Sequence, residues 1–196
     1  MAAATELPAL PSPPAAAAGG GGVPEAEVAA MKAEMESERA LRESVSPKAT
    51  AAGTAALHAT HAFQCGAMAE GQRLLAEAEA GVAALLAEIE AGPRAWYTRG
   101  APAVAHCLEA YTTAACCGHF FSHGALAPRA SLASLQDPEY LQGAMGFVQE
   151  LSRYAIGRAT AGDVGSVLLC STLSASLFAK LAEFDFRNGP LRRKVP

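Results

Sequence analysis

The sequence contains few aromatic residues and no long uninterrupted apolar segment. Aromatic side chains make up 6% of its 196 residues, and the hydrophobic share of 51% comes largely from alanine. Chains rich in alanine and poor in β-branched and aromatic residues favour helices over sheets. No run approaches the roughly 20 apolar residues that cross a bilayer, so we expect no membrane span. The N-terminus also lacks the basic residues and unbroken apolar stretch of a secretory signal, which predicts a soluble intracellular protein.

Common catalytic signatures are also missing. The chain has no G-x-x-x-x-G-K-[ST] phosphate loop, no H-E-x-x-H pair and no G-x-S-x-G turn. Its five cysteines are an odd number, which favours free buried thiols over a disulfide framework. Cys116 and Cys117 are adjacent on a predicted helix, where neighbouring side chains diverge, so we expect no disulfide between them. The net charge of −4 excludes a protein that is basic overall but allows a local basic groove.

A helical pattern follows an N-terminus of unusual composition. Residues 1–24 are almost entirely Ala, Pro and Gly and are predicted to be a disordered tail, and residues 25–196 a helical domain. Because no strand alternation or hairpin turn is present, the predicted fold is all-α, a bundle of about six or seven helices. Pro47 is expected to end or kink the first helix. The predicted segments begin after Pro24, near Lys48, near Ala69, near Pro102, at Pro128, at Asp137 and after Gly162.

Two of these segments have further features. Residues 102–123 are apolar on almost every side, which predicts the most buried element of the fold. Asp137 can cap the next long helix, with Pro138 at its first position and Glu139 near the positive end of its dipole.

Gly162 and Asp163 separate the last two predicted helices. In one interpretation, Gly162 adopts a left-handed conformation after one helix and Asp163 caps the next. In the other, Asp163 belongs to a phosphate or metal site, and a metal would need at least one further carboxylate facing it.

A second candidate metal site lies on the apolar helix. Cys116, His119 and His123 fall on about one helical face, a geometry that zinc can use. The alternative is that these side chains are hydrogen-bonded core residues. A helical scaffold or zinc-binding bundle is therefore one hypothesis for the function.

Basic and aromatic residues suggest contacts with nucleic acid. Tyr97, beside Trp96, and Arg99 are typical of the stacking elements of single-strand binders. Solvated surface charge is the alternative. The candidate phosphate contacts in the last third of the chain are Arg153, Arg158, Arg192, Arg193 and Lys194.

The region 138–194 carries a series of short sequence motifs. P-E-Y-L-Q-G opens a predicted helix, E-L-S-R continues it, A-T-A-G-D closes it, and F-R-N-G-P-L-R-R-K follows further on. In this order they resemble the translin family, and a weaker likeness extends over most of residues 25–196. The resemblance implies an all-α fold that assembles into a hollow octamer around single-stranded RNA or DNA. The octamer contains translin alone or translin with its paralogue, translin-associated factor X.

The resemblance also implies a role in RNA processing. The mixed complex of this family is an endoribonuclease that helps to remove the passenger strand of small interfering RNA and processes transfer RNA fragments. We therefore expect a cytoplasmic and nuclear protein with a paralogous partner and no membrane contact.

The catalytic paralogue holds a divalent metal with a pattern like L-E-E-Y-x-E and a later aspartate. Here Glu109 matches the first acid and Asp163 the aspartate, but Ala110 and Thr113 replace the other two. This favours a nucleic-acid-binding subunit that is not catalytic alone and needs no cofactor, with Mg²⁺ belonging to a complex with a catalytic paralogue. The alternative is a Mg²⁺-dependent endoribonuclease in its own right.

Two departures from the family pattern stand out. The family has a basic stretch like Y-R-x-H-x-x-W-R before the middle helix, whereas residues 96–102 keep an aromatic and an arginine but no histidine. The family's last long helix should follow Lys194, and it is missing here. We expect its loss to expose apolar surface on the bundle.

Overall fold

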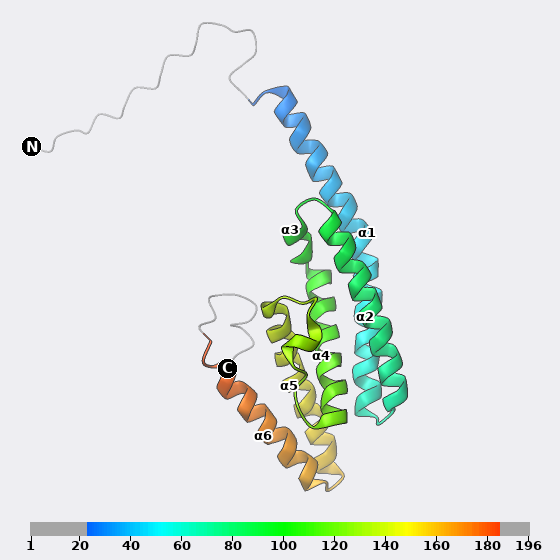
Figure 1. Cartoon of the computed structure of the whole chain (residues 1–196), viewed down its shortest axis with the longest axis vertical. Helices are drawn as coiled ribbons and strands as arrows, with labels where there is room; N and C mark the ends of the chain where they lie inside the picture. The colour runs from blue at the N-terminus through cyan, green and yellow to red at the C-terminus, as the bar shows by residue number, and fades with distance from the viewer. Residues whose placement is uncertain (1–22, 185–196) are drawn as a thin grey trace, which may run out of the picture. The chain divides into compact units, whose positions relative to one another are not determined.

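The structure is a computed structural model that describes residues 23–184, and within that range it contains helices and turns but no strand. The all-α prediction is confirmed. The tail predicted over residues 1–24 lies outside this range except for its last two residues. In chain order the elements are α1 (Glu25–Gln64), α2 (Met68–Ala91), α3 (Ala95–Arg99), α4 (Pro102–His123), the 3₁₀ helix η1 (Arg129–Leu132), α5 (Asp137–Thr160) and α6 (Val164–Leu181) (Figure 1).

The chain divides into two units between Glu36 and Ser37. The described residues of the first unit are the opening turns of α1. Two large apolar side chains of these turns are on the surface: Met31 is 48% exposed and Met35 is 66% exposed.

Pro47 does not interrupt α1. The break predicted there, with a new helix from Lys48, is wrong, because α1 continues to Gln64 with Pro47 inside it. Pro47 lies on the exposed side of the helix. Water can therefore hydrogen-bond the Glu43 carbonyl that loses its helical partner, which makes the proline tolerable.

The second unit is built around α4. Figure 1 shows α4 between α5 and the pair formed by α2 and the later part of α1. Glycines allow the close contacts: Gly53 of α1 lies against Cys107, and a Cβ at Gly143 of α5 would overlap the Thr112 side chain. The prediction that residues 102–123 form the most buried element is confirmed.

The start of α5 differs in detail from its prediction. Gln136, not Asp137, is the N-cap residue, and it forms a capping box with Glu139, whose Oε2 accepts the Gln136 N–H at 2.7 Å. Asp137 is the first helical residue, and its carboxylate pairs with Arg129 at 2.9 Å. A side chain engaged with Arg129 is not available to cap the helix.

The corner between α5 and α6 follows the capping interpretation. Gly162 has a φ of 77°, and the Asp163 side chain accepts the Ser166 N–H at 3.0 Å. α6 then packs on α5 but buries only Cys170 and Leu181. It is also the one described helix that is long and apolar enough to cross a membrane by length and composition, over 18 residues. We expected no segment with the length and apolar composition of a membrane span, and α6 corrects that expectation. Length and composition alone do not distinguish a membrane helix from a helix that is covered by protein.

Candidate nucleic-acid interface

A short helix displays two aromatic side chains on the surface of the second unit. α3 follows a tight turn in which a Cβ at Gly92 would overlap Leu41, and Arg94 adopts a left-handed conformation with a φ of 46°. After this turn, Trp96 is 77% exposed and Tyr97 is 43% exposed. Their rings meet edge to face, with centroids 5.7 Å apart. Exposed aromatic faces of this kind are the platforms on which single-strand binders stack bases.

Two arginines flank this aromatic pair. The guanidinium carbon of Arg42 lies 4.3 Å from the centre of the Tyr97 ring, a cation–π arrangement. Arg94 Nη1 is 3.4 Å from Glu38 Oε2, and Arg42 Nε is 3.8 Å from Glu38 Oε1. The Glu38 side chain is buried, whereas both arginines are substantially exposed. Two guanidinium groups thus contact the same carboxylate beside the rings.

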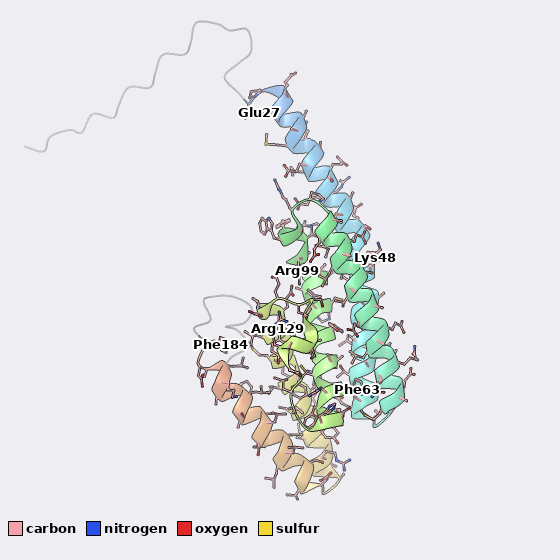
Figure 2. The ribbon with its side chains drawn as sticks, viewed as in Figure 1. Glu27, Lys48, Phe63, Arg99, Arg129 and Phe184 are labelled. Carbon is pink, nitrogen blue, oxygen red and sulfur yellow. The ribbon has the colours of Figure 1, made fainter. Side chains whose placement is uncertain are left out.

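Arg99, predicted as a nucleic-acid contact, joins α3 to the start of α5. Its Nε and Nη2 donate to the two carboxylate oxygens of Glu139 at 2.7 and 2.8 Å, and Nη2 also donates to the Ser134 carbonyl at 3.0 Å. The Arg99 side chain is 11% exposed, and Figure 2 shows where it lies between these elements. The hydrogen bonds that Arg99 donates to Glu139 raise the pKa of Arg99 above its usual value. The guanidinium group of Arg99 is therefore engaged in hydrogen bonds within the fold.

The two candidate arginines of α5 each pair with an acid close by in sequence. Arg153 Nη1 lies 2.5 Å from Glu150 Oε1, and Arg158 donates to Asp163 Oδ2 from Nε and Nη2 at 3.0 and 2.6 Å. Both arginine side chains are partly exposed, so a phosphate can approach them. It would have to compete with the carboxylates of Glu150 and Asp163 for the guanidinium groups. The remaining candidates, Arg192, Arg193 and Lys194, lie outside the described residues.

Asp163 is fully engaged as a cap. Besides the Ser166 N–H and the two Arg158 donors, its carboxylate accepts the Ser166 hydroxyl at 2.7 Å. These hydrogen bonds, from Ser166 first and then Arg158, lower the pKa of Asp163 from 3.8 to about 2. The carboxylate is therefore ionised for structural reasons.

Glu109 lies on α4 and accepts a hydrogen bond from Gln142 Nε2 at 2.7 Å. The neighbouring positions do not supply further acids: Ala110 is buried, and Thr113 donates to the Gly143 carbonyl at 3.1 Å. A Cβ at Gly146 would overlap the Thr113 hydroxyl, so α5 lies too close to α4 for a longer side chain at this position. Within residues 23–184, no group of three His, Cys, Asp or Glu side chains is arranged to hold a metal ion.

The candidate zinc ligands also do not converge on one point. Cys116 is buried beside the Ala127 backbone, and burial raises the pKa of its thiol to about 12, which disfavours the thiolate that zinc requires. The His119 and His123 rings stack on each other with centroids 4.3 Å apart. All five cysteines are free, as predicted, and four of them are buried, but Cys65 is exposed.

Sequence reasoning missed Arg42 and Glu38. They stand more than 50 residues before Trp96 and Tyr97, in a helix whose pattern suggested only a charged exposed face. A Glu and an Arg spaced i, i+4 indicate a helical ion pair, but nothing local indicates that Arg42 lies over Tyr97.

Comparison with known proteins agrees with the geometry at the level of the fold. The chain matches solved structures over the same all-α arrangement. A crystal structure of apo-NeC3PO, a translin-like C3PO homologue, matches with a TM-score of 0.73 and 14% sequence identity, covering 90% of each chain. Neither protein-family profiles nor curated protein sequences match this chain. The chain therefore has the translin-type fold.

Proposed function

We propose that this chain is a single-stranded RNA- or DNA-binding subunit of a translin-type oligomer, which supports endoribonucleolytic RNA processing in the cytoplasm and nucleus. The observation that carries the proposal is the exposed pair Trp96 and Tyr97, flanked by Arg42 and Arg94, on this fold. Base–aromatic stacking tolerates any sequence, because every base has a π face. The arginines supply the phosphate contacts that make such binding depend on salt.

The same chain is not expected to cut RNA. A hard cation such as Mg²⁺ needs several oxygen ligands, and Ala110 and Thr113 occupy two of the positions where the catalytic pattern has acids. Asp163 is engaged by Ser166 and Arg158. Catalysis therefore belongs to a paralogue of the translin-associated factor X type, which would bind the Mg²⁺.

Assembly is supported by the apolar surface of α5 and α6. The large apolar side chains exposed there are between 48% and 69% accessible, although α6 has the length and composition of a buried helix. Contiguous exposed apolar surface marks sites of association, which supports a homo- or hetero-oligomer. The exposed side chains are those of Ile156, Val164, Leu168 and Leu169.

Oligonucleotide binding tests the proposal directly. We expect fluorescence anisotropy to show binding of labelled single strands of about 20 nucleotides that weakens strongly between roughly 50 and 200 mM salt. The double variant Arg42→Gln, Arg94→Gln should bind about tenfold more weakly and reduce the slope of log K against log salt by about 1.4, or about 0.7 for each lost phosphate contact.

Arg73→Gln is the matched control. Arg73 is an exposed arginine paired with Glu70 and Glu77, and it stands about 27 Å along α2 from the end next to α3. Its replacement should leave affinity unchanged. No binding at low salt, or an equal loss in Arg73→Gln, would contradict the proposed interface. Mg²⁺-dependent cleavage that Glu109→Gln abolishes would contradict the non-catalytic assignment.

A further inference from the structure

A pocket of the second unit is bordered by α2, α4 and η1, and neither Trp96 nor Tyr97 lines it. Its volume is about 280 Å³, close to the roughly 300 Å³ at which the range of small-molecule sites begins. Phe63, which Figure 2 labels, reaches the pocket from the last turn of α1. The other side chains on which the chemistry of the pocket depends are those of Gln72, Leu75, Glu79, Tyr111, His119 and His123.

Apolar side chains form one part of the wall. Phe63 is buried, and a Cβ at Gly118 of α4 would lie 2.9 Å from its ring and 3.5 Å from the Leu75 side chain. The glycine therefore lets Phe63 and Leu75 pack closely against α4. A wall of this kind accommodates the hydrocarbon part of a small ligand.

The charged part of the wall is the Glu79 carboxylate. Among the described residues that line the pocket, none is a lysine or an arginine. The buried Tyr111 hydroxyl donates a hydrogen bond to Glu79, and burial together with the Glu79 charge raises the pKa of Tyr111 to about 12. Tyr111 is therefore a neutral donor, which orients the carboxylate without cancelling its negative charge.

The two histidines do not turn the pocket into a metal site. Their rings stack with centroids 4.3 Å apart, and His123 Nδ1 is 3.2 Å from the His119 carbonyl oxygen. Across the described part of the chain, no three side chains of metal-binding type are arranged around one point. An anion would be repelled by Glu79, whereas an organic cation matches both the carboxylate and the apolar wall.

We propose that this pocket binds a small organic amine in its ammonium form, with the charged nitrogen at Glu79 and the hydrocarbon part against Phe63 and Leu75. The volume limits the ligand to one ring or a short chain. The site goes beyond the proposed strand binding and does not depend on it, because the two use different residues.

Three small probes of similar shape test the role of charge. Phenethylamine, 2-phenylethanol and phenylacetate each carry one ring on a short chain and differ in charge. The full-length protein is titrated at about pH 8, where imidazole groups are ordinarily uncharged, and ligand-observed saturation-transfer NMR gives each dissociation constant. We expect phenethylamine to bind about fivefold more tightly than 2-phenylethanol, the effect of one solvent-accessible ion pair. Phenylacetate should bind more weakly than both.

Three variants locate the binding. Glu79→Gln should remove the difference between the amine and the alcohol. Glu77→Gln is the matched control, since it changes an exposed carboxylate of the same helix that pairs with Arg73 and does not line this pocket, and it should leave the difference unchanged. Gln72→Lys adds a cation at an exposed position of the wall. It should weaken the binding of phenethylamine and strengthen that of phenylacetate.

Each contrary result is decisive. Equal affinity for the three probes, or no binding of phenethylamine, overturns the proposal. A preference for the amine that persists in Glu79→Gln overturns the assignment to this carboxylate, and unchanged affinities in Gln72→Lys overturn the assignment to this pocket. The order of the three probes on the unaltered protein does not depend on the folding of any variant. None of these results bears on strand binding, which is measured without an amine.

Discussion

α4 and α6 have similarly apolar sequences but opposite surroundings. Twelve residues of α4 are buried, whereas α6 buries two. α4 lies among α1, α2 and α5, whereas α6 packs mainly on α5. The two helices thus differ in burial, although their compositions are comparable, because α4 is enclosed by other helices of the chain and α6 is covered on one side.

The difference shows what an apolar helix does and does not specify. Apolar surface is stabilised by removal from water, at about 25 cal/mol for each Å², but the covering surface can belong to the same chain or to a partner. At α4 the fit is made by small residues, since Gly143 and Gly146 allow α5 to approach Thr112 and Thr113. α6 has exposed leucines at Leu168 and Leu169 instead.

Replacing one leucine in each helix measures this difference most directly. Leu108 is 1% exposed and Leu168 is 62% exposed. We expect Leu108→Ala to lower the free energy of unfolding by about 3 kcal/mol, because it leaves a cavity in the core. Leu168→Ala should change it by less than about 0.5 kcal/mol, as exposed substitutions do. Urea denaturation followed by far-UV circular dichroism, at equal protein concentrations, gives both values. Equal losses would show that α6 is buried as α4 is.

A second test addresses the close contact between α4 and α5. Gly143→Ala should destabilise the protein by about 2 kcal/mol, since the new methyl group overlaps the buried Thr112 side chain. Gly157→Ala is the control in the same helix, because nothing lies within 4 Å of a Cβ at that position. There the better helix propensity of alanine should raise stability by about 0.5 to 1 kcal/mol. A tolerated Gly143→Ala would mean that the two helices are not in such close contact.

A third test uses pH at the corner where α6 begins. The pKa of Asp163 is lowered from 3.8 to about 2 in the folded state. A lowered folded-state pKa contributes stability above the unfolded value, and that stability is lost as the pH falls from about 4 to about 2. Asp163→Asn retains a capping oxygen but loses the charge that Arg158 binds, so its melting temperature should be below that of the unaltered protein at neutral pH.

The difference between the two melting temperatures should shrink as the pH is lowered through this window. A difference that stays constant down to about pH 2 would show that the carboxylate charge does not contribute.

Local sequence signals predicted much of the fold. The starts of α2 and α4 were predicted within a residue, near Ala69 and near Pro102, and capping by Asp163 was one interpretation of its place after Gly162. Pro47 was misjudged. A proline inside a helix is usually disruptive, and its exposure, which makes it tolerable here, cannot be read from the neighbouring residues.

The candidate interface was only half predictable. Trp96 and Tyr97 were recognised as aromatic residues beside arginines. Because Arg99 is close to them in sequence, it was predicted to contact nucleic acid, but in the fold it binds Glu139. Arg99 binds Glu139, 40 residues later, while Arg42 lies over Tyr97 from 55 residues earlier. Such pairings arise from helix packing, so they leave no signal in the local sequence.

The smallest expected effect on stability is the most informative about α6. The double variant Leu168→Ser, Leu169→Ser should unfold within about 0.5 kcal/mol of the unaltered protein, since both side chains are exposed. If a partner surface covers α6, light scattering should nevertheless show a smaller particle for the variant, because association is lost without loss of the fold. If α6 instead meets a lipid surface, the unaltered protein should float with neutral phosphatidylcholine vesicles and the variant should not. An unchanged particle size without flotation would place the assembly contact elsewhere and remove the reason for treating α6 as the counterpart of α4.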